Sequence, residues 1–84
     1  METNQHYKTS DTALAAYLIT AKFPIPQIDY EKPRFEYLFP MSERIQEAAK
    51  NYLSGNALTD PSDYARIFKK LNRIIFKRYQ WKED

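Results

Sequence analysis

The sequence predicts a small α+β domain in which a two-stranded antiparallel hairpin packs on helices, with the elements in the order α-β-β-α-α. Residues 60–81 show the apolar spacing of one long helix, and residues 27–30 and 34–39 alternate in the manner of two short strands joined by a turn. An isolated hairpin is marginally stable in water, so its aromatic face is expected to lie against the helices.

The composition limits the class of protein. An 84-residue chain with 43% hydrophobic residues and a single glycine is expected to form one domain, residues 9–84, after a polar, disordered lead-in at residues 1–8. The absence of cysteine excludes disulfides and thiolate metal ligands. The chain has no signal peptide and no apolar run of about 18 residues, so we expect a cytoplasmic protein without membrane contact.

A buried helix is predicted over residues 12–22. Asp11 is a suitable N-cap, and the following alanine, leucine and isoleucine residues make the segment apolar nearly all round. Pro24 cannot continue the helix. A second, amphipathic helix is predicted over residues 43–53, with Ser42 as its N-cap and Gly55 just beyond its end.

The hairpin has a preferred register. Pairing Ile28 with Tyr37 and Tyr30 with Phe35 places these apolar side chains on one face. The same register makes Asp29 and Glu36 neighbours on the outer face. Two carboxylates alone are a weak cation site, and no further polar cluster or glycine-rich loop suggests a catalytic pocket. We therefore expect no enzyme activity, no metal and no cofactor.

The final helix begins with strong signals and carries two distinct faces. Asp60 is a suitable N-cap, Pro61 suits the first helical position, and the helix is expected to continue to Trp81. Its apolar face is expected to join the core. Its opposite face collects basic residues without an intervening acid: Arg66, Lys69, Lys70, Arg73 and Lys77.

Charge is distributed unevenly along the chain. Residues 61–84 contain seven basic and three acidic residues, a net charge of +4, whereas residues 1–60 contain six basic and eight acidic residues, a net charge of −2. An electrostatic footprint confined to one element is typical of nucleic-acid binding, and the asymmetry also permits self-association. We expect Arg66, Lys69, Lys70, Arg73 and Lys77 to contact phosphates and Phe76 to stack on a base.

Two alternatives stay open. The basic face is typical of a solvated surface, and cations near a helix C-terminus favourably meet the helix dipole. The second alternative is a protein-interaction or homodimerisation module, which would use an unpaired edge of the hairpin or a partner interface formed by Phe76, Arg78, Tyr79 and Trp81.

Three segments of the chain carry a family resemblance. They are Thr9-Ser10-Asp11-Thr12-Ala13-Leu14-Ala15-Ala16-Tyr17-Leu18, the aromatic strand 35–39, and Tyr52-Leu53-Ser54-Gly55 followed by the helix that Asp60 begins. Together they resemble a family of short prokaryotic domains of unknown function, often encoded in mobile or phage-like settings. The resemblance implies a stand-alone accessory domain and supplies no catalytic residues. The expected partner is DNA or RNA, bound with little sequence specificity, or a larger protein of a nucleic-acid-processing system.

Overall fold

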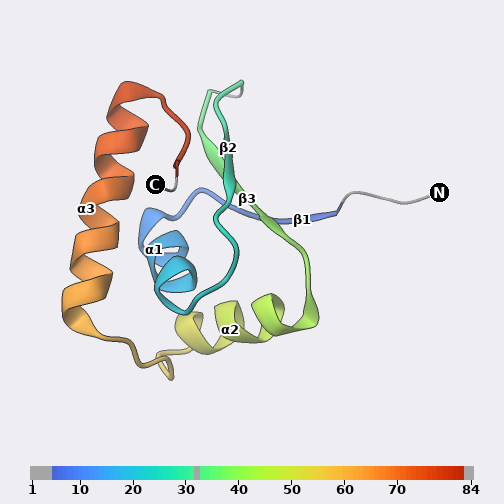
Figure 1. Cartoon of the computed structure of the whole chain (residues 1–84). Coiled ribbons are helices and arrows are strands. Elements are labelled where there is room, and N and C mark those ends of the chain that lie inside the picture. Colours follow the sequence, from blue (N-terminus) through green and yellow to red (C-terminus); the bar gives the residue numbers. More distant parts are fainter. Residues whose placement is uncertain (1–4, 32, 83–84) are drawn as a thin grey trace.

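The computed structural model describes residues 5–31 and 33–82, which form a three-stranded antiparallel sheet and three helices (Figure 1). In chain order the elements are β1 (His6–Thr9), α1 (Thr12–Thr20), β2 (Gln27–Asp29), β3 (Glu36–Pro40), α2 (Glu43–Leu53) and α3 (Pro61–Lys77). The predicted α+β class and the order α-β-β-α-α from α1 onward are confirmed.

The sheet has one strand more than predicted. β1 pairs antiparallel with β3, with Tyr7 opposite Phe39 and Thr9 opposite Tyr37. The prediction of a disordered lead-in is therefore wrong for residues 6–8, and residues 1–4 of that lead-in lie outside the described residues. A strand of four residues is too short to show a clear alternation of apolar and polar side chains. Its hydrogen bonds also come from a strand about 30 residues away, so the local sequence does not indicate it.

The register of the predicted hairpin is confirmed where the two strands pair. Ile28 lies opposite Tyr37 and Asp29 opposite Glu36. The ladder stops there, so β2 and β3 do not include Tyr30 and Phe35. The strand order is β1-β3-β2, which places β3 in the centre of the sheet. Because β3 is the central strand, its aromatic residues Tyr37 and Phe39 are completely buried.

α1 lies between the sheet and α3, as Figure 1 shows. Leu14, Ala15, Ala16, Leu18 and Ile19 are all buried, because this short helix has neighbours on several sides. Asp11 caps it as predicted, accepting hydrogen bonds from the backbone N–H groups of residues 13 and 14 at 2.9 and 3.3 Å. The helix ends at Thr20, two residues before the predicted end.

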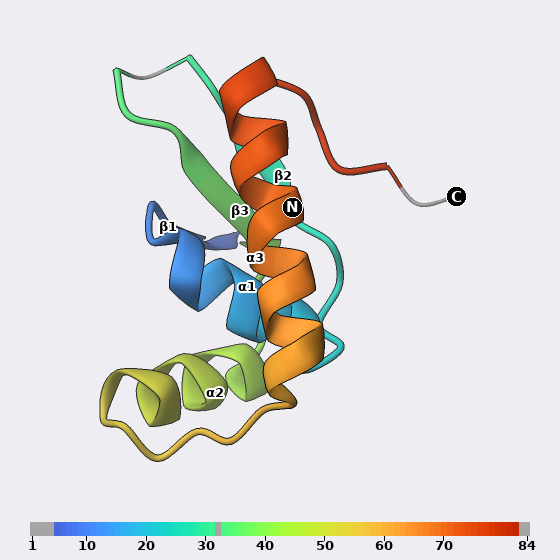
Figure 2. The ribbon, with the colours of Figure 1, turned by 90° about the vertical axis from the view of Figure 1, so that its left-hand side faces the viewer.

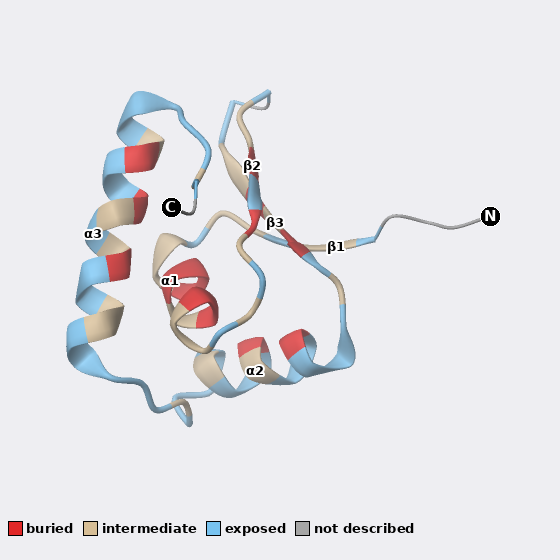
Figure 3. Ribbon diagram, in the orientation of Figure 1, coloured by how far each residue is buried: buried red, intermediate tan, exposed pale blue. Residues whose placement is uncertain are grey.

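The other two helices begin as predicted. Ser42 caps α2, and Asp60 caps α3 by accepting from the backbone N–H of Ser62 at 2.9 Å. Figure 2 shows α2 lying crosswise near the N-terminal end of α3. On α3 the buried residues face α1, while the opposite side of the helix is exposed along its length (Figure 3).

α3 ends at Lys77, four residues before the predicted end at Trp81. Arg78 adopts a left-handed backbone conformation, with φ of 58°, and its N–H donates to the last turn of the helix. The chain then turns back, and residues 79–82 run between α3 and β2 (Figure 1). We call residues 78–82 the C-terminal strap.

Candidate nucleic-acid interface

The orientation of α3 is fixed by its buried face. Ile67, Leu71 and Ile74 are buried, with Leu71 completely inaccessible to solvent. These positions are spaced by three and four residues and define one side of the helix. The side chains on the opposite side therefore face the solvent, which is where the sequence analysis placed the basic residues.

Three of those basic residues form a row on the exposed side. Lys69, Arg73 and Lys77 are each exposed, and each follows the previous one by four residues. Four residues of helix rise about 6 Å, so the row holds one positive charge per turn along the axis. Within residues 5–31 and 33–82, none of the three forms an ion pair with a carboxylate. The row is therefore electrostatically available to an anionic ligand.

Phe76 lies on this exposed side as well. Its side chain is 87% exposed, an unusual position for a residue that would bury a large apolar area in a core. It follows Arg73 by three residues and Lys69 by seven, so the three share one face of the helix. Proteins that bind single-stranded nucleic acid use this arrangement: the cations contact the backbone phosphates, and an aromatic ring stacks on an unpaired base.

The other two predicted phosphate contacts already have partners in the chain. The guanidinium of Arg66 lies 3.2 Å from the carboxylate of Asp63, an exposed pair that contributes little and can exchange for a ligand. The ammonium of Lys70 lies 4.0 Å from the centre of the Trp81 ring, a cation–π contact. Lys70 thus turns toward the C-terminal strap, at the flank of the row.

The predicted partner interface is not one surface. Arg78 places its guanidinium over the Tyr30 ring, 4.8 Å from the centroid, and donates to the Tyr30 carbonyl at 3.0 Å. The half-buried Trp81 packs against the core beneath Lys70. Phe76, in contrast, lies on the exposed side of α3. Only Phe76 and Tyr79 of the four predicted residues are exposed aromatics.

Tyr30 ties the C-terminal strap to the hairpin. Its hydroxyl donates to the Tyr79 carbonyl at 2.6 Å and to the Ile74 carbonyl at 3.3 Å. Burial raises the pKa of Tyr30 above its usual value, and the positive charge of Arg78 acts in the opposite direction. A neutral hydroxyl is the form that can donate these bonds, so the strap is held at neutral pH.

Gln80 is a structural residue that the sequence analysis missed. Its side-chain amide accepts from the Ile28 N–H and donates to the Ile28 carbonyl, both at 2.7 Å. One amide therefore satisfies the outer edge of β2 as a neighbouring strand would. The opposite edge of the predicted hairpin is covered by β1. The β3 edge of the predicted hairpin is therefore paired and the β2 edge is bonded at Ile28, while homodimerisation itself stays a prediction.

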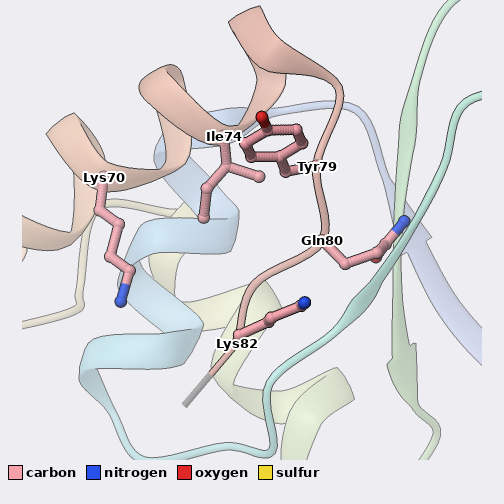
Figure 4. Close-up of a pocket in the computed structure, with 5 residues that line it drawn as sticks. All are labelled: Lys70, Ile74, Tyr79, Gln80 and Lys82. Carbon is pink, nitrogen blue, oxygen red and sulfur yellow. The ribbon is translucent and has the colours of Figure 1, made fainter. Parts of the chain in front are cut away.

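A pocket of about 570 Å³ lies between α3 and the C-terminal strap. Figure 4 shows its lining side chains: Lys70, Ile74, Tyr79, Gln80 and Lys82. Its walls are mainly apolar, and its two lysines come from different segments of the chain. No sequence pattern predicts this pocket, because it exists only once α3 has ended and the chain has folded back.

Two further features are absent from the part of the chain that the structure describes. Across residues 5–31 and 33–82, no three histidine, aspartate or glutamate side chains are grouped so that they could bind a metal ion. No helix in these ranges is long and apolar enough to cross a membrane. Asp29 and Glu36 are neighbours as predicted, and a carboxylate oxygen of Asp29 accepts from the Glu31 backbone N–H at 2.9 Å.

The fold and the exposed helix define a small α+β domain with a basic, aromatic surface. The chain belongs to a family described as a domain of unknown function, DUF5659, which matches residues 4–77. The match runs from before β1 to the last residue of α3. It confirms the predicted resemblance to a family of unknown function. No curated protein and no solved structure matches the chain.

Proposed function

We propose that this protein is a non-enzymatic accessory protein that binds nucleic acid through the exposed side of α3. Lys69, Arg73 and Lys77 contact successive backbone phosphates, and Phe76 stacks on an unpaired base. Arg66 and Lys70 add contacts at the two flanks after exchanging their present partners. The observation that carries the proposal is Phe76, 87% exposed beside a row of cations without carboxylate partners in the described chain.

The ligand favoured by this arrangement is a single strand. Phosphate contacts give affinity without sequence preference, and a solvent-facing ring can stack only on a base that is not already paired. Binding to DNA and RNA single strands of many sequences follows.

The setting expected for the family belongs to the same proposal. A small protein that binds strands without sequence preference suits an accessory role in a bacterial mobile element or phage. Its partners there are nucleic acid and the larger proteins that process it. The proposal therefore places the protein in the cytoplasm, where both kinds of partner are found.

The test is fluorescence anisotropy with labelled single-stranded and duplex DNA and RNA of one length, from low to physiological salt. For three to five phosphate contacts on a single strand, the slope of log affinity against log salt is expected to lie between about −2 and −3.5. Reversing the three charges in K69E/R73E/K77E should lower affinity by more than about tenfold and flatten this slope.

Two matched controls distinguish the effect of these three cations and Phe76 on binding from the effects of net charge and of any exposed apolar side chain. K8E/K22E/K50E makes the same change in net charge on exposed side chains outside α3, and should lower affinity less than about threefold because distant charges are screened. Phe76→Ala should weaken single-strand binding about tenfold, as expected for one stacked base, whereas Leu58→Ala, at a leucine 93% exposed, should not. Unchanged binding by K69E/R73E/K77E in a folded protein would falsify the proposal.

A second candidate function is a protein-interaction module. The exposure of Phe76 also suits an aromatic anchor that fills a pocket on a partner or on a second copy of the chain. Such an interface is largely apolar, so its affinity should change little with salt. Analytical ultracentrifugation of the wild type and of Phe76→Ala, together with flat salt curves for every nucleic acid, would favour this candidate over the first.

A further inference from the structure

The pocket between α3 and the C-terminal strap has features of a small-molecule site that the proposed function does not use. Its volume of about 570 Å³ falls within the usual range for ligand sites. It combines an apolar floor at Ile74 and an aromatic wall at Tyr79 with two cationic side chains, Lys70 and Lys82. A ligand that fits this lining has a flat apolar body and a negatively charged group.

The walls of the pocket are held in place by hydrogen bonds to the rest of the fold. The Tyr79 backbone N–H donates to the Ile74 carbonyl at 3.0 Å, and its carbonyl accepts from the Tyr30 hydroxyl at 2.6 Å. Gln80 is bonded to both backbone groups of Ile28. These bonds fix the backbone that carries the Tyr79 ring, which is 61% exposed, so the backbone requires little ordering when a ligand binds.

The positive charges of the two lysines indicate that the ligand carries a negatively charged group. Lys70 is held at 4.0 Å from the Trp81 ring, a contact that leaves ammonium hydrogens free to donate to an anion. Lys82 is exposed and extends from the strap with its ammonium directed away from Lys70 in Figure 4, so its flexible side chain must turn back for the two lysines to hold one anion. In residues 5–31 and 33–82 neither ammonium has a carboxylate partner. Two positive charges match a terminal phosphate monoester, which carries about −1.5 to −2 at pH 7, better than a phosphodiester.

We propose that this pocket binds a nucleoside 5′-monophosphate, with its base against Tyr79 and Ile74 and its phosphate held by Lys70 and Lys82. The group is either a free nucleotide or the phosphorylated end of a strand, which share this chemistry. The site shares only Lys70 with the proposed strand contacts and uses none of Lys69, Arg73 and Lys77, so it goes beyond the proposed function and does not depend on it.

The probes are UMP and AMP, with uridine, adenosine and inorganic phosphate for comparison. The chain contains a single tryptophan, Trp81, and Lys70 lies on its ring, so movement of Lys70 toward a phosphate should change the fluorescence. We expect saturable binding of UMP or AMP with a Kd of about 1 mM or lower. Loss of either the base or the phosphate should weaken it at least about tenfold, because the two halves of the ligand contact different walls.

A pair of double variants tests the assignment with equal changes in charge. K70Q/K82Q removes the two cations of the pocket, and K69Q/K77Q removes two from the exposed row. Isothermal titration calorimetry should show nucleotide binding lost in the first and kept in the second, and Tyr79→Ala should also weaken it. Strand binding should weaken more in K69Q/K77Q, which loses two cations of the exposed row, than in K70Q/K82Q, which loses the single flanking contact of Lys70. Failure of one proposal is therefore distinguishable from failure of the other.

The source of the nucleotide is resolved by comparing one oligonucleotide with and without a 5′-phosphate. Dependence on the phosphate that K70Q/K82Q abolishes supports binding of a strand end. Binding of UMP or AMP alone, with no effect of the 5′-phosphate on the oligonucleotide, supports a free nucleotide. The proposal is overturned if neither probe binds saturably, or if K70Q/K82Q binds as well as K69Q/K77Q while both variants keep the wild-type circular dichroism and melting temperature.

Discussion

At the scale of single residues, tyrosines make contacts that the sequence could not assign. Tyr37 is completely buried in β3, and its hydroxyl shares a 2.9 Å hydrogen bond with the hydroxyl of Thr12 at the start of α1. The Tyr30 hydroxyl donates to the Tyr79 carbonyl beyond the end of α3, with the Ile74 carbonyl in the last turn of α3 as a second, longer acceptor. Hydrophobic patterning predicted which face each tyrosine occupies, but a hydroxyl's partner depends on which distant atoms the fold brings near. Such partners follow from the tertiary structure alone.

The phenol of Tyr64 leads to a prediction about alkaline stability. Burial, together with the nearby Tyr52 hydroxyl and the charge of Asp11, raises the pKa of Tyr64 from 10.0 to about 12. Above pH 10 the unfolded chain loses this proton while the folded chain keeps it, so the free energy of unfolding decreases as pH rises from about 10 to 12. Tyr64→Phe should therefore lose less stability over this interval than the wild type.

Urea unfolding followed by circular dichroism at pH 8, 9.5, 10.5 and 11 measures this difference. The decrease in unfolding free energy should be smaller in the variant, although not absent, because burial also raises the pKa of Tyr30 and Tyr37. Equal decreases in the two proteins would show that Tyr64 titrates alike in the folded and unfolded states.

At the scale of elements, the helices were predictable and the ends of the chain were not. α2 has the predicted bounds, and α1 and α3 have the predicted N-caps, because these signals lie within a few residues of one another. β1 and the end of α3 depend on partners far away in the sequence. The helix was predicted to continue to Trp81, although its apolar face turns basic at Arg78 and Lys82. In the structure Arg78 contacts Tyr30 and adopts a left-handed conformation that ends the helix.

The C-terminal strap is held to the sheet by Gln80, and this gives a prediction for the element. Gln80→Ala removes two hydrogen bonds to Ile28, which should lower the free energy of unfolding by about 1–3 kcal/mol. Urea unfolding measures the change, and hydrogen exchange should show faster exchange at the Ile28 amide.

Gln27→Ala is the matched control for that substitution. Gln27 lies on the same strand, and its exposed side chain makes no hydrogen bond with another described residue, so the change should be within about 0.5 kcal/mol. If Gln80→Ala were no more destabilising than Gln27→Ala, the hydrogen bonds between Gln80 and Ile28 would not contribute to the stability of the fold.

At the scale of the whole molecule, one short helix organises the core. α1 packs on the sheet, on α2 and on α3, and the buried residues of all these elements form a single cluster around it. Its apolar sequence predicted burial, but not that the other two helices would both lie against it. The same arrangement leaves the outer side of α3 without a neighbour in the described chain, so the predicted basic face is exposed. The residues of the predicted partner interface are separated, because Phe76 lies on this outer side and Trp81 lies against Lys70.

This central position makes α1 the most sensitive element of the fold. Leu18 is completely buried, and Leu18→Ala removes its side chain from the cluster, which should cost about 2–5 kcal/mol. A domain of this size is expected to have a total unfolding free energy of only about 5–15 kcal/mol, so the variant should melt far below the wild type. Leu58→Ala makes the same chemical change at a leucine that is 93% exposed and should leave the melting temperature nearly unchanged. Circular dichroism melts of the three proteins compare these effects, and similar melting temperatures for the two variants would mean that α1 does not occupy the centre of the core.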